Sequence, residues 1–342
     1  MTDKEVRSLF FDSHFADQPI KELPCDNLSR EEWLSYRTSL LSLGGSDMGT
    51  ILGLNKYKDV TRLYFEMIDP MQRYITRNNT DSIFAFWGRA FEDKIADMWQ
   101  YHDGDDESMM LNESKGYKVK EWRKRDSMIY NEDYPFIVAN IDGEIVNHPL
   151  VGSGILEIKT ISGYAYDMWQ SIPPYYYLQP QAYMIATGSD YAEIAALRDG
   201  RHLEVYCFDA NINIQNRIIE EAYAFMERVE KGRSMDTSNM TKEKFFHHAL
   251  EWAPEPSNAD YTEFLKENKN LRDARNDIDA DTELEEMALE YLSLKEGIKE
   301  NKGELETLEQ LIKYRLTKDS AVRATSPKIR ITWKNKFLVR RQ

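Results

Sequence analysis

Short apolar runs separated by polar turns characterise the middle of the chain. Ile137–Gly143 and Gly154–Thr160 have the composition of short strands, and the segment between them, Asn147–Gly154, contains the glycine and proline of a turn region. Further strands are predicted over residues 117–122, 128–130, 191–197 and 201–208. The last two flank Asp199-Gly200, a dipeptide typical of tight β-hairpins, so we expect them to pair.

Apolar residues at spacings of three and four predict helices between these strands. The clearest stripe is expected to form the inner face of a helix over residues 82–101, and it consists of Phe84, Trp87, Phe91, Ile95 and Met98. Other helices are predicted over residues 48–52, 61–67, 163–170, 177–186 and 211–231. This succession predicts an α/β fold in which a central mixed sheet is flanked by helices.

A different pattern follows residue 250. Residues 232–258 contain Gly232, Pro254 and Pro256 and are expected to hold the domain boundary. Apolar positions from Leu284 to Ile312 then repeat as heptads, which predicts one long coiled-coil-like helix, and Ile329–Trp333 alternates like a short terminal strand. We therefore expect one domain over residues 1–250 and a helical extension with a basic strand over residues 251–342.

Charge and cysteine content narrow the class of protein. The net charge is −15, but residues 323–342 carry seven basic residues and no acid, so the preceding 322 residues carry −22. An acidic body argues against a general nucleic-acid coat, although a locally basic cleft can still bind DNA. Two cysteines cannot form a disulfide framework, and no apolar stretch is long enough for a signal peptide or a membrane span. We expect a cytoplasmic protein that does not bind membranes.

The most informative polar residues lie in the two central strands. Glu157 and Lys159 are two residues apart and therefore point to the same side of a strand, while Leu156, Ile158 and Ile161 are expected to face mainly the other way. Asp142 ends the preceding apolar run. Charged groups among apolar strand residues are costly to bury without a metal or a partner. Two carboxylates and a lysine suit metal-assisted phosphodiester cleavage, although an acid and a lysine at this spacing usually form a solvent-facing ion pair.

Four other polar or aromatic groups have two interpretations each. Gly44-Gly45-Ser46-Asp47 precedes a helix, and this arrangement suits either a phosphate or a plain helix cap. Glu92 lies at the edge of the apolar stripe and is either an ordinary solvated acid or a residue of the site. Gln179 and Tyr183 share one face of the predicted helix, and Gln181 lies on another face. The sequence does not decide which of these two faces is turned toward the site. The tyrosines 175–177 are packing residues or a stacking surface for nucleotide bases.

These motifs occur in a recognisable order along the chain. Leu43–Gly53 comes first, then Gly88–Glu92, then Asp142 with Glu157-Ile158-Lys159, and then Gln179–Met184. From about residue 37 to residue 206, this order resembles the YqaJ-like viral recombinases and phage lambda-type exonucleases, a family of the PD-(D/E)xK nuclease superfamily. The resemblance rests on all of these motifs together.

The resemblance implies a fold, an activity and partners. It implies a restriction-endonuclease-like core and Mg²⁺-dependent 5′-to-3′ degradation of linear double-stranded DNA, with Mn²⁺ as a possible substitute. The product would be a 3′ single strand on which a single-strand annealing protein loads for recombination. The family also implies a homotrimer. Relatives with an iron–sulfur cluster need four cysteines, so no such cluster is expected here.

The resemblance also implies roles for individual residues. Asp142, Glu157 and the carbonyl of Ile158 would bind the metal, Glu92 would support it or bind a second ion, and Lys159 would position or activate water. Ser46 and Arg37 would bind the 5′-phosphate, although nine residues separate them here and the family usually has about seven. The residues expected to hold the DNA near the cleavage site are Gln179, Gln181 and Tyr183.

Two alternatives remain. The first is another activity of the same superfamily, an endonuclease or a RecB-type repair nuclease. The second is a non-catalytic DNA-binding or coiled-coil assembly protein, which the heptads favour. The presence of all four residues Glu92, Asp142, Glu157 and Lys159 argues against the second alternative, because a binding module does not need all four.

Overall fold

The computed structural model describes most of the first 268 residues and three strands near the C-terminus. The described residues are 20–25, 27–29, 32–33, 40–68, 83–163, 172–236, 238–258, 260–268, 282, 323–325, 329–333 and 337–341. The chain divides into two compact units, Met1–Ala274 and Arg275–Gln342. The division thus lies after Ala274 rather than near residue 250. The heptad segment Leu284–Ile312 lies outside the described residues, so the long helix stays a prediction.

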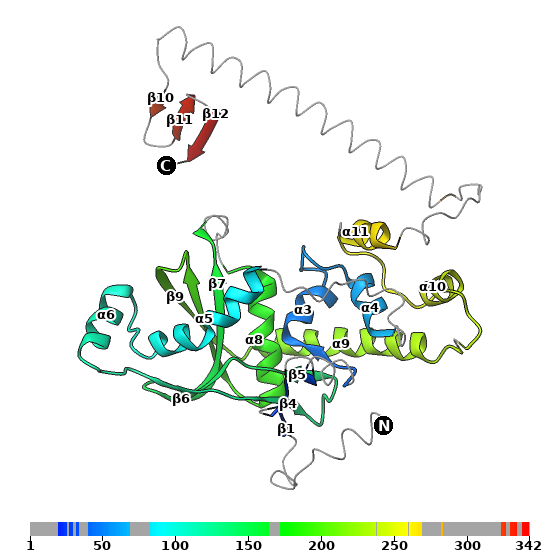
Figure 1. The fold of residues 1–342 in the computed structure, drawn as a ribbon, viewed down its shortest axis with the longest axis horizontal. Coiled ribbons are helices and arrows are strands. Elements are labelled where there is room, and N and C mark those ends of the chain that lie inside the picture. Colours follow the sequence, from blue (N-terminus) through cyan, green and yellow to red (C-terminus); the bar gives the residue numbers. More distant parts are fainter. Residues whose placement is uncertain are drawn as a thin grey trace. The chain divides into compact units, whose positions relative to one another are not determined.

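A five-stranded mixed sheet forms one part of the first unit (Figure 1). In spatial order its strands are β3 (Glu121–Arg123), β6 (Gly143–His148), β7 (Gly152–Ile161), β8 (Tyr191–Arg198) and β9 (His202–Asp209). Strands β7 and β8 are parallel, and the other neighbours are antiparallel. Asp199 and Gly200 have positive φ angles of 52° and 67° in the turn between β8 and β9. The predicted hairpin is therefore confirmed.

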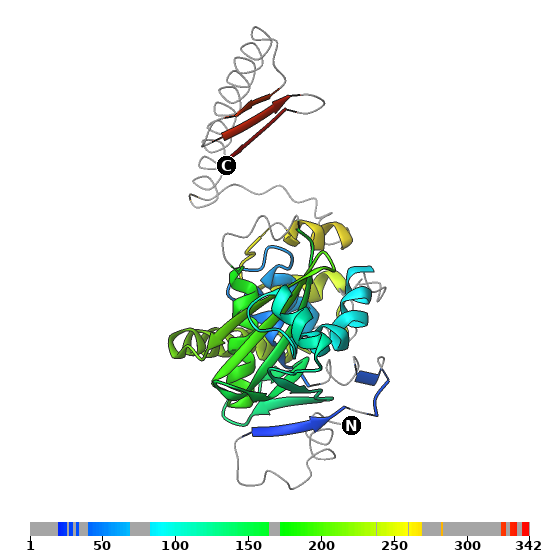
Figure 2. The same ribbon diagram turned by 90° about the vertical axis from the view of Figure 1, so that its left-hand side faces the viewer.

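A second, four-stranded sheet accompanies it, so the single central sheet expected from the sequence is two sheets. Its order is β1 (Ile20–Pro24), β4 (Ser127–Asn131), β5 (Ile137–Ala139) and β2 (Leu43–Gly44). Strand β1 forms one edge (Figure 2). The expected strand Ile137–Gly143 was wrong as one element, because β5 ends at Ala139 in this sheet and β6 starts at Gly143 in the other. Asp142 thus lies where the chain passes from one sheet to the other.

Helix α5 (Ile83–Trp99) covers one face of the five-stranded sheet with its C-terminal half. Ile95 and Trp99 pack in one apolar cluster with Leu156 and Ile158 of β7. Leu156 and Ile158 therefore face the core as expected. Ile161 does not join them, and instead packs with residues of β8 on the face of Glu157.

The N-terminal half of α5 is exposed, which corrects the expected inner stripe. Phe84, Trp87 and Phe91 are 82%, 50% and 39% exposed. The rings of Trp87 and Phe91 stack on each other with 5.4 Å between their centroids. The stripe exists, but only its second half reaches the sheet. Helical spacing reports which residues share a face and does not report where the packing surface ends.

Helix α8 (Pro174–Thr187) is the central element of the first unit. It packs against β4 and β5 of one sheet, β7 and β8 of the other, and the short helix α3 (Gly45–Ile51) (Figure 1). Leu178, Ala182 and Tyr183 contribute its side of the largest apolar core. Because α8 touches both sheets, it fixes the junction at which Asp142 lies.

The remaining helices surround this core. They are α4 (Val60–Ile68), α6 (Asp106–Ser114), α9 (Ile212–Arg233), α10 (Lys242–Leu250) and α11 (Asp260–Glu267). Buried polar contacts tie α11 to α4. Asp59 accepts a hydrogen bond from the backbone N–H of Ser257 at 2.6 Å, and the Arg62 guanidinium contacts Asp260 at 2.8 Å and Glu267 at 2.6 Å. Residues beyond 250 therefore complete the first unit.

The second unit contains an antiparallel three-stranded sheet. Its order is β10 (Arg323–Thr325), β11 (Ile329–Trp333) and β12 (Phe337–Arg341). The predicted terminal strand is confirmed as β11, the middle strand of this sheet.

Candidate active site

The backbone of β7 holds Asp142 at the junction between the sheets. Its Oδ2 atom accepts a hydrogen bond from the backbone N–H of Ile158 at 2.7 Å. Glu157 and Lys159 flank Ile158 on the strand and point to one face, where their side chains form a hydrogen-bonded ion pair. Folding thus brings together the three residues on which the sequence argument depended.

Glu157 is the most deeply buried acid of this group, with 2% of its surface exposed. Its Oε1 atom accepts hydrogen bonds from the Lys159 ammonium and from Nε2 of Gln179, the latter at 2.6 Å. Its Oε2 atom is buried and has no hydrogen-bond partner among the described residues. A buried carboxylate oxygen without a partner is costly, and such atoms commonly mark a ligand or ion position.

The environment raises the pKa of every carboxyl in the group. Burial, reinforced by the charge of Asp142, raises the pKa of Glu157 to about 8. Burial also raises the pKa of Asp142, although Lys159 and the Ile158 N–H oppose this. Burial lowers the pKa of Lys159, but the charges of Glu157 and Asp142 outweigh it and leave that pKa raised. These carboxyls therefore favour an added positive charge nearby.

Glu92 approaches the group from α5. Its side chain is half-buried, and burial followed by the charge of Asp142 raises its pKa. That electrostatic interaction means that Glu92 and Asp142 face a common region. The neighbouring Asp93 instead pairs with Lys124 at 2.8 Å on the exposed side of the helix. Glu92 is thus the acid of this helix that lies toward the candidate site.

Close packing of α3 on α8 brings Ser46 near the acids. A Cβ atom at Gly45 would lie 2.6 Å from Cε1 of Tyr183 and 2.9 Å from Cγ of Gln179, so the approach requires glycine. The backbone N–H of Gly44 donates to the Asp47 carboxylate at 3.0 Å and closes the start of the helix. The helix begins at Gly45, earlier than the predicted start at Met48.

A cavity of about 180 Å³ joins these elements. It is lined by Ser42, Gly44, Ser46, Met128, Val138, Asn140, Asp142, Gln179 and Tyr183. The predicted phosphate-binding serine and one predicted metal ligand therefore open into one space. The sequence argument missed Ser42 and Asn140. The interruption of the apolar run at Asn140 was a usable signal, since it marks where β5 ends.

The two candidate glutamines have different roles. Gln179 donates from Nε2 to both Glu157 and, at 2.9 Å, the Tyr183 hydroxyl. Gln181 points away from the cavity, because its amide bonds the carbonyl of Asp209 and the backbone N–H of Asn211, each at 2.9 Å. The assignment of Gln181 to DNA binding is therefore corrected. It links α8 to the start of α9.

The arginine expected at the 5′-phosphate is not placed by the structure. Arg37 lies outside the described residues. Arg62 of α4 is buried and engaged by Asp260 and Glu267. Arg62 therefore has no part in the candidate site.

The donor set fits a hard divalent cation. Asp142, Glu157 and Glu92 supply carboxylate oxygens, and one oxygen of Glu157 is buried without a hydrogen bond. No three His, Cys, Asp or Glu side chains of the described residues converge at metal-ligand spacing as they stand. The Lys159 ammonium supplies the positive charge beside Glu157 in this arrangement.

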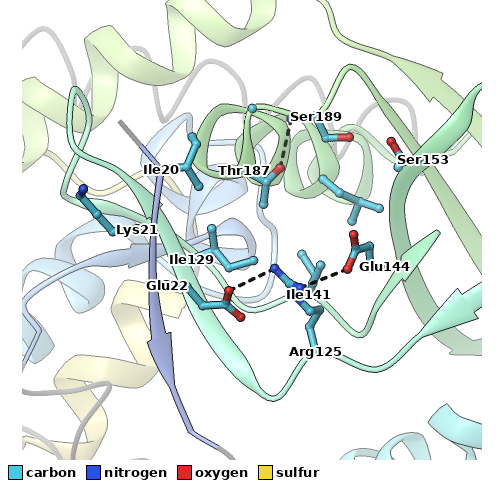
Figure 3. A pocket seen from close by; sticks show the side chains of 13 residues that line it. Ile20, Lys21, Glu22, Arg125, Ile129, Ile141, Glu144, Ser153, Thr187 and Ser189 are labelled. Atoms are coloured by element: carbon cyan, nitrogen blue, oxygen red, sulfur yellow. Dashed lines mark hydrogen bonds and ion pairs between the residues drawn. The ribbon is translucent and has the colours of Figure 1, made fainter. Parts of the chain in front are cut away.

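A separate cavity of about 260 Å³ lies between the two sheets (Figure 3). Ile129, Ile141 and other apolar residues line part of it, and Arg125 bridges Glu22 at 3.1 Å and Glu144 at 3.3 Å beside it. This bridge ties β1 to β6. None of the four residues Glu92, Asp142, Glu157 and Lys159 lines this cavity.

Comparison with known proteins finds similarity over the part of the chain that carries the site. Residues 32–190 match the model of the YqaJ-like viral recombinase domain. Over this range the chain is similar to that domain. The chain is 26% identical over 296 residues to the uncharacterized protein YqaJ of Bacillus subtilis (strain 168), which covers 84% of this chain and 79% of that protein. The residues that match the family model include Ser46, Glu92, Asp142, Glu157, Lys159 and Gln179.

Solved structures show weaker similarity. An alkaline exonuclease, LHK-Exo from Laribacter hongkongensis, is 17% identical, covers 65% of this chain and 100% of its own, and has a TM-score of 0.43. The same enzyme in complex with dAMP is 17% identical, covers 59% and 93%, and has a TM-score of 0.44. Within the described part of the chain, no helix combines the length and apolar character needed to cross a membrane.

Proposed function

We propose that this protein is a Mg²⁺-dependent deoxyribonuclease that degrades linear double-stranded DNA from its 5′ ends and leaves 3′ single strands. The observation that carries the proposal is the convergence of Asp142, Glu157, Lys159 and Gln179, with Asp142 and Gln179 opening into the cavity that Ser46 also lines. The match to the viral recombinase domain supports a role in recombination by strand annealing.

The acidic residues would bind the metal. Asp142, Glu157 and the carbonyl of Ile158 are the proposed ligands, and Glu92 would assist or bind a second ion. Mg²⁺, or Mn²⁺ in its place, would polarise the scissile phosphate and lower the pKa of the attacking water when bound. Gln179 fixes the orientation of the Glu157 carboxylate through its 2.6 Å hydrogen bond.

Lys159 has a charge-stabilising role in this proposal. Because its pKa is raised, Lys159 is an ammonium at neutral pH. A protonated lysine cannot deprotonate water, so we assign Lys159 to orienting the water and to stabilising negative charge on the phosphate. Loss of the ammonium should therefore lower the rate of cleavage more than DNA affinity.

Recognition of the 5′ end would involve the start of α3. Ser46 is exposed at this point and lines the cavity, so its hydroxyl can contact a terminal phosphate. Arg37 is proposed as its partner. We further propose that the protein forms a homotrimer, that an annealing protein receives the 3′ strand, and that the protein acts in the cytoplasm.

The test is digestion of linear duplex DNA that carries a 5′-phosphate on one end only, in Mg²⁺ or in EDTA. Mg²⁺-dependent loss of the phosphorylated strand, with a closed circle left intact, is the expected result. Cutting of the circle would favour an endonuclease instead. Binding without digestion under all metal conditions would overturn the nuclease proposal in favour of a DNA-binding protein.

A further inference from the structure

A row of aromatic and basic side chains leads away from Lys159. The Lys159 ammonium lies 5.8 Å from the centre of the Tyr176 ring, and the Tyr176 and Tyr175 rings are 4.6 Å apart. The Tyr57 ring meets Tyr175 at 6.2 Å, and Lys56 lies 5.0 Å from the centre of the Tyr57 ring. These five residues, the tyrosine row, connect the candidate active site to the surface.

The backbone around the row is firmly positioned. Tyr175 and Tyr176 lie in the first turn of α8, directly after Pro174, and α3 lies so close that a Cβ at Gly49 would be 2.7 Å from Cβ of Tyr175. Tyr57 follows Asn55, whose side chain accepts the Tyr57 N–H at 2.9 Å. The rings are therefore held in place before any ligand binds, which reduces the entropy cost of binding.

Tyr57 has the exposure of a binding residue rather than of a core residue. It is 68% exposed, whereas Tyr64 of the neighbouring helix is fully buried. The planes of Tyr57 and Tyr175 are inclined by 86°, so the edge-to-face contact fixes the orientation of the Tyr57 ring. An oriented aromatic face in solvent contributes little to the core and is available to a planar ligand.

The charges of the row select a polyanion. Lys56 and Lys159 lie at its two ends, and burial raises the pKa of Tyr175 and Tyr176 between them, which keeps these two phenols uncharged at neutral pH. Lys58 is nearby but pairs with Glu66 at 2.7 Å and Asp47 at 3.8 Å, and Lys159 pairs with Glu157, so the exposed Lys56 supplies the positive charge at the outer end of the row. Aromatic faces flanked by lysines suit nucleotides, in which bases alternate with phosphates.

We propose that the tyrosine row binds unpaired nucleotides of the DNA strand whose phosphate lies at Lys159, with a base stacked on Tyr57 and a phosphate near Lys56. This inference rests on the proposed nuclease function and specifies its substrate contact. A base in a duplex is covered by its neighbours, so the row selects strand ends that have separated. Tyr57 thus gives the protein a preference for frayed or single-stranded termini over closed duplex.

The test measures binding of a 5′-phosphorylated single strand in EDTA, with and without abasic nucleotides near its 5′ end. Tyr57→Ala should weaken binding of the normal strand by roughly 5- to 150-fold, the range for losing one stacked base, while Tyr57→Phe stays within about twofold. Tyr117→Ala is the matched control, since Tyr117 is also exposed, at 62%, and is not part of the row.

The abasic strands separate a stacking role from a structural one. The wild type should lose affinity for a strand that lacks the stacked base, and Tyr57→Ala should show no further loss, because the contact is already gone. Equal abasic penalties in the two proteins, or unchanged binding by Tyr57→Ala, would overturn the tyrosine row as a DNA contact. If the tyrosine row fails this test but metal-dependent digestion is intact, the nuclease proposal still holds. If the wild type does not digest DNA, the nuclease proposal fails whatever the binding results are.

Discussion

Replacing Glu157 by glutamine should stabilise the metal-free protein while removing its function. Glu157 is 2% exposed, and its pKa is raised to about 8 from an ordinary value of 4.5. A carboxyl with a raised pKa binds its proton more tightly in the folded state than in the unfolded state. The wild-type free energy of unfolding must therefore fall as the pH rises from about 4.5 to about 8. Glutamine has no proton to lose, so the variant lacks this dependence.

The size of the effect follows from the pKa difference. Each unit corresponds to about 1.4 kcal/mol, so the wild type should lose about 2 kcal/mol of stability through this group between pH 6 and pH 8. That is a large share of the 5–15 kcal/mol typical of a domain. Groups distant from Glu157 titrate alike in both proteins and cancel in the comparison. Such a gain in stability with loss of function is typical of residues selected for activity.

The assay is denaturant-induced unfolding in EDTA at pH 6, 7 and 8. The stability of Glu157→Gln relative to wild type should grow steadily with pH, and the exposed control Glu255→Gln should follow wild type throughout. Addition of Mg²⁺ should stabilise wild type more at pH 8 than at pH 6, since metal ligands must be deprotonated, and should not stabilise Glu157→Gln. A stability difference that does not change with pH would refute the reasoning.

Three further changes test the packing and charge around the site. Gln179→Leu should slow cleavage about 10- to 100-fold in single-turnover assays, because it removes a hydrogen bond to a carboxylate. Tyr183→Phe should have a smaller effect. A larger effect of Tyr183→Phe than of Gln179→Leu would contradict the role given to Gln179. Gly45→Ala should lower the melting temperature and the cleavage rate, since the added Cβ would lie 2.6 Å from the Tyr183 ring. Gly88→Ala should lower neither, because the nearest contact of its Cβ is at 3.8 Å. Equal melting temperatures of the two variants would argue against close packing of α3 on α8. Deletion of residues 320–342, which carry seven basic residues, should weaken DNA binding and flatten its dependence on salt, and identical binding at every salt concentration would exclude a DNA contact there.

Which side chains of the site lie together was predictable where it depends on local spacing. Residues two apart on a strand must share a face, so Glu157 and Lys159 were placed correctly from the sequence. Residues four apart on a helix also share a face, so Gln179 and Tyr183 were expected together, and their hydrogen bond confirms this. Whether Gln179 or Gln181 faces the site depends on how α8 is rotated against two sheets, and no local pattern contains that information.

Long-range packing explains where the sequence argument was wrong. The apolar run ending at Asp142 leads from one sheet to the other, since β5 ends at Ala139 and β6 starts at Gly143, and periodicity does not report such a change of partner strand. The aromatic half of α5 has perfect helical spacing and still lies in solvent. The boundary near residue 250 was suggested by prolines, yet Asp260 is bound to Arg62 almost two hundred positions earlier. Contacts of that sequence separation are invisible to composition.

The most direct test of the central claim is single-turnover release of the first nucleotide from a 5′-phosphorylated duplex in Mg²⁺. Wild type should be compared with Lys159→Ala and with Lys94→Ala, a control lysine whose side chain is 81% exposed on α5. The account predicts that Lys159→Ala loses nucleotide release while retaining DNA binding, and that Lys94→Ala behaves as wild type. Release by Lys159→Ala at the wild-type rate would contradict the assignment of this site as the centre of cleavage.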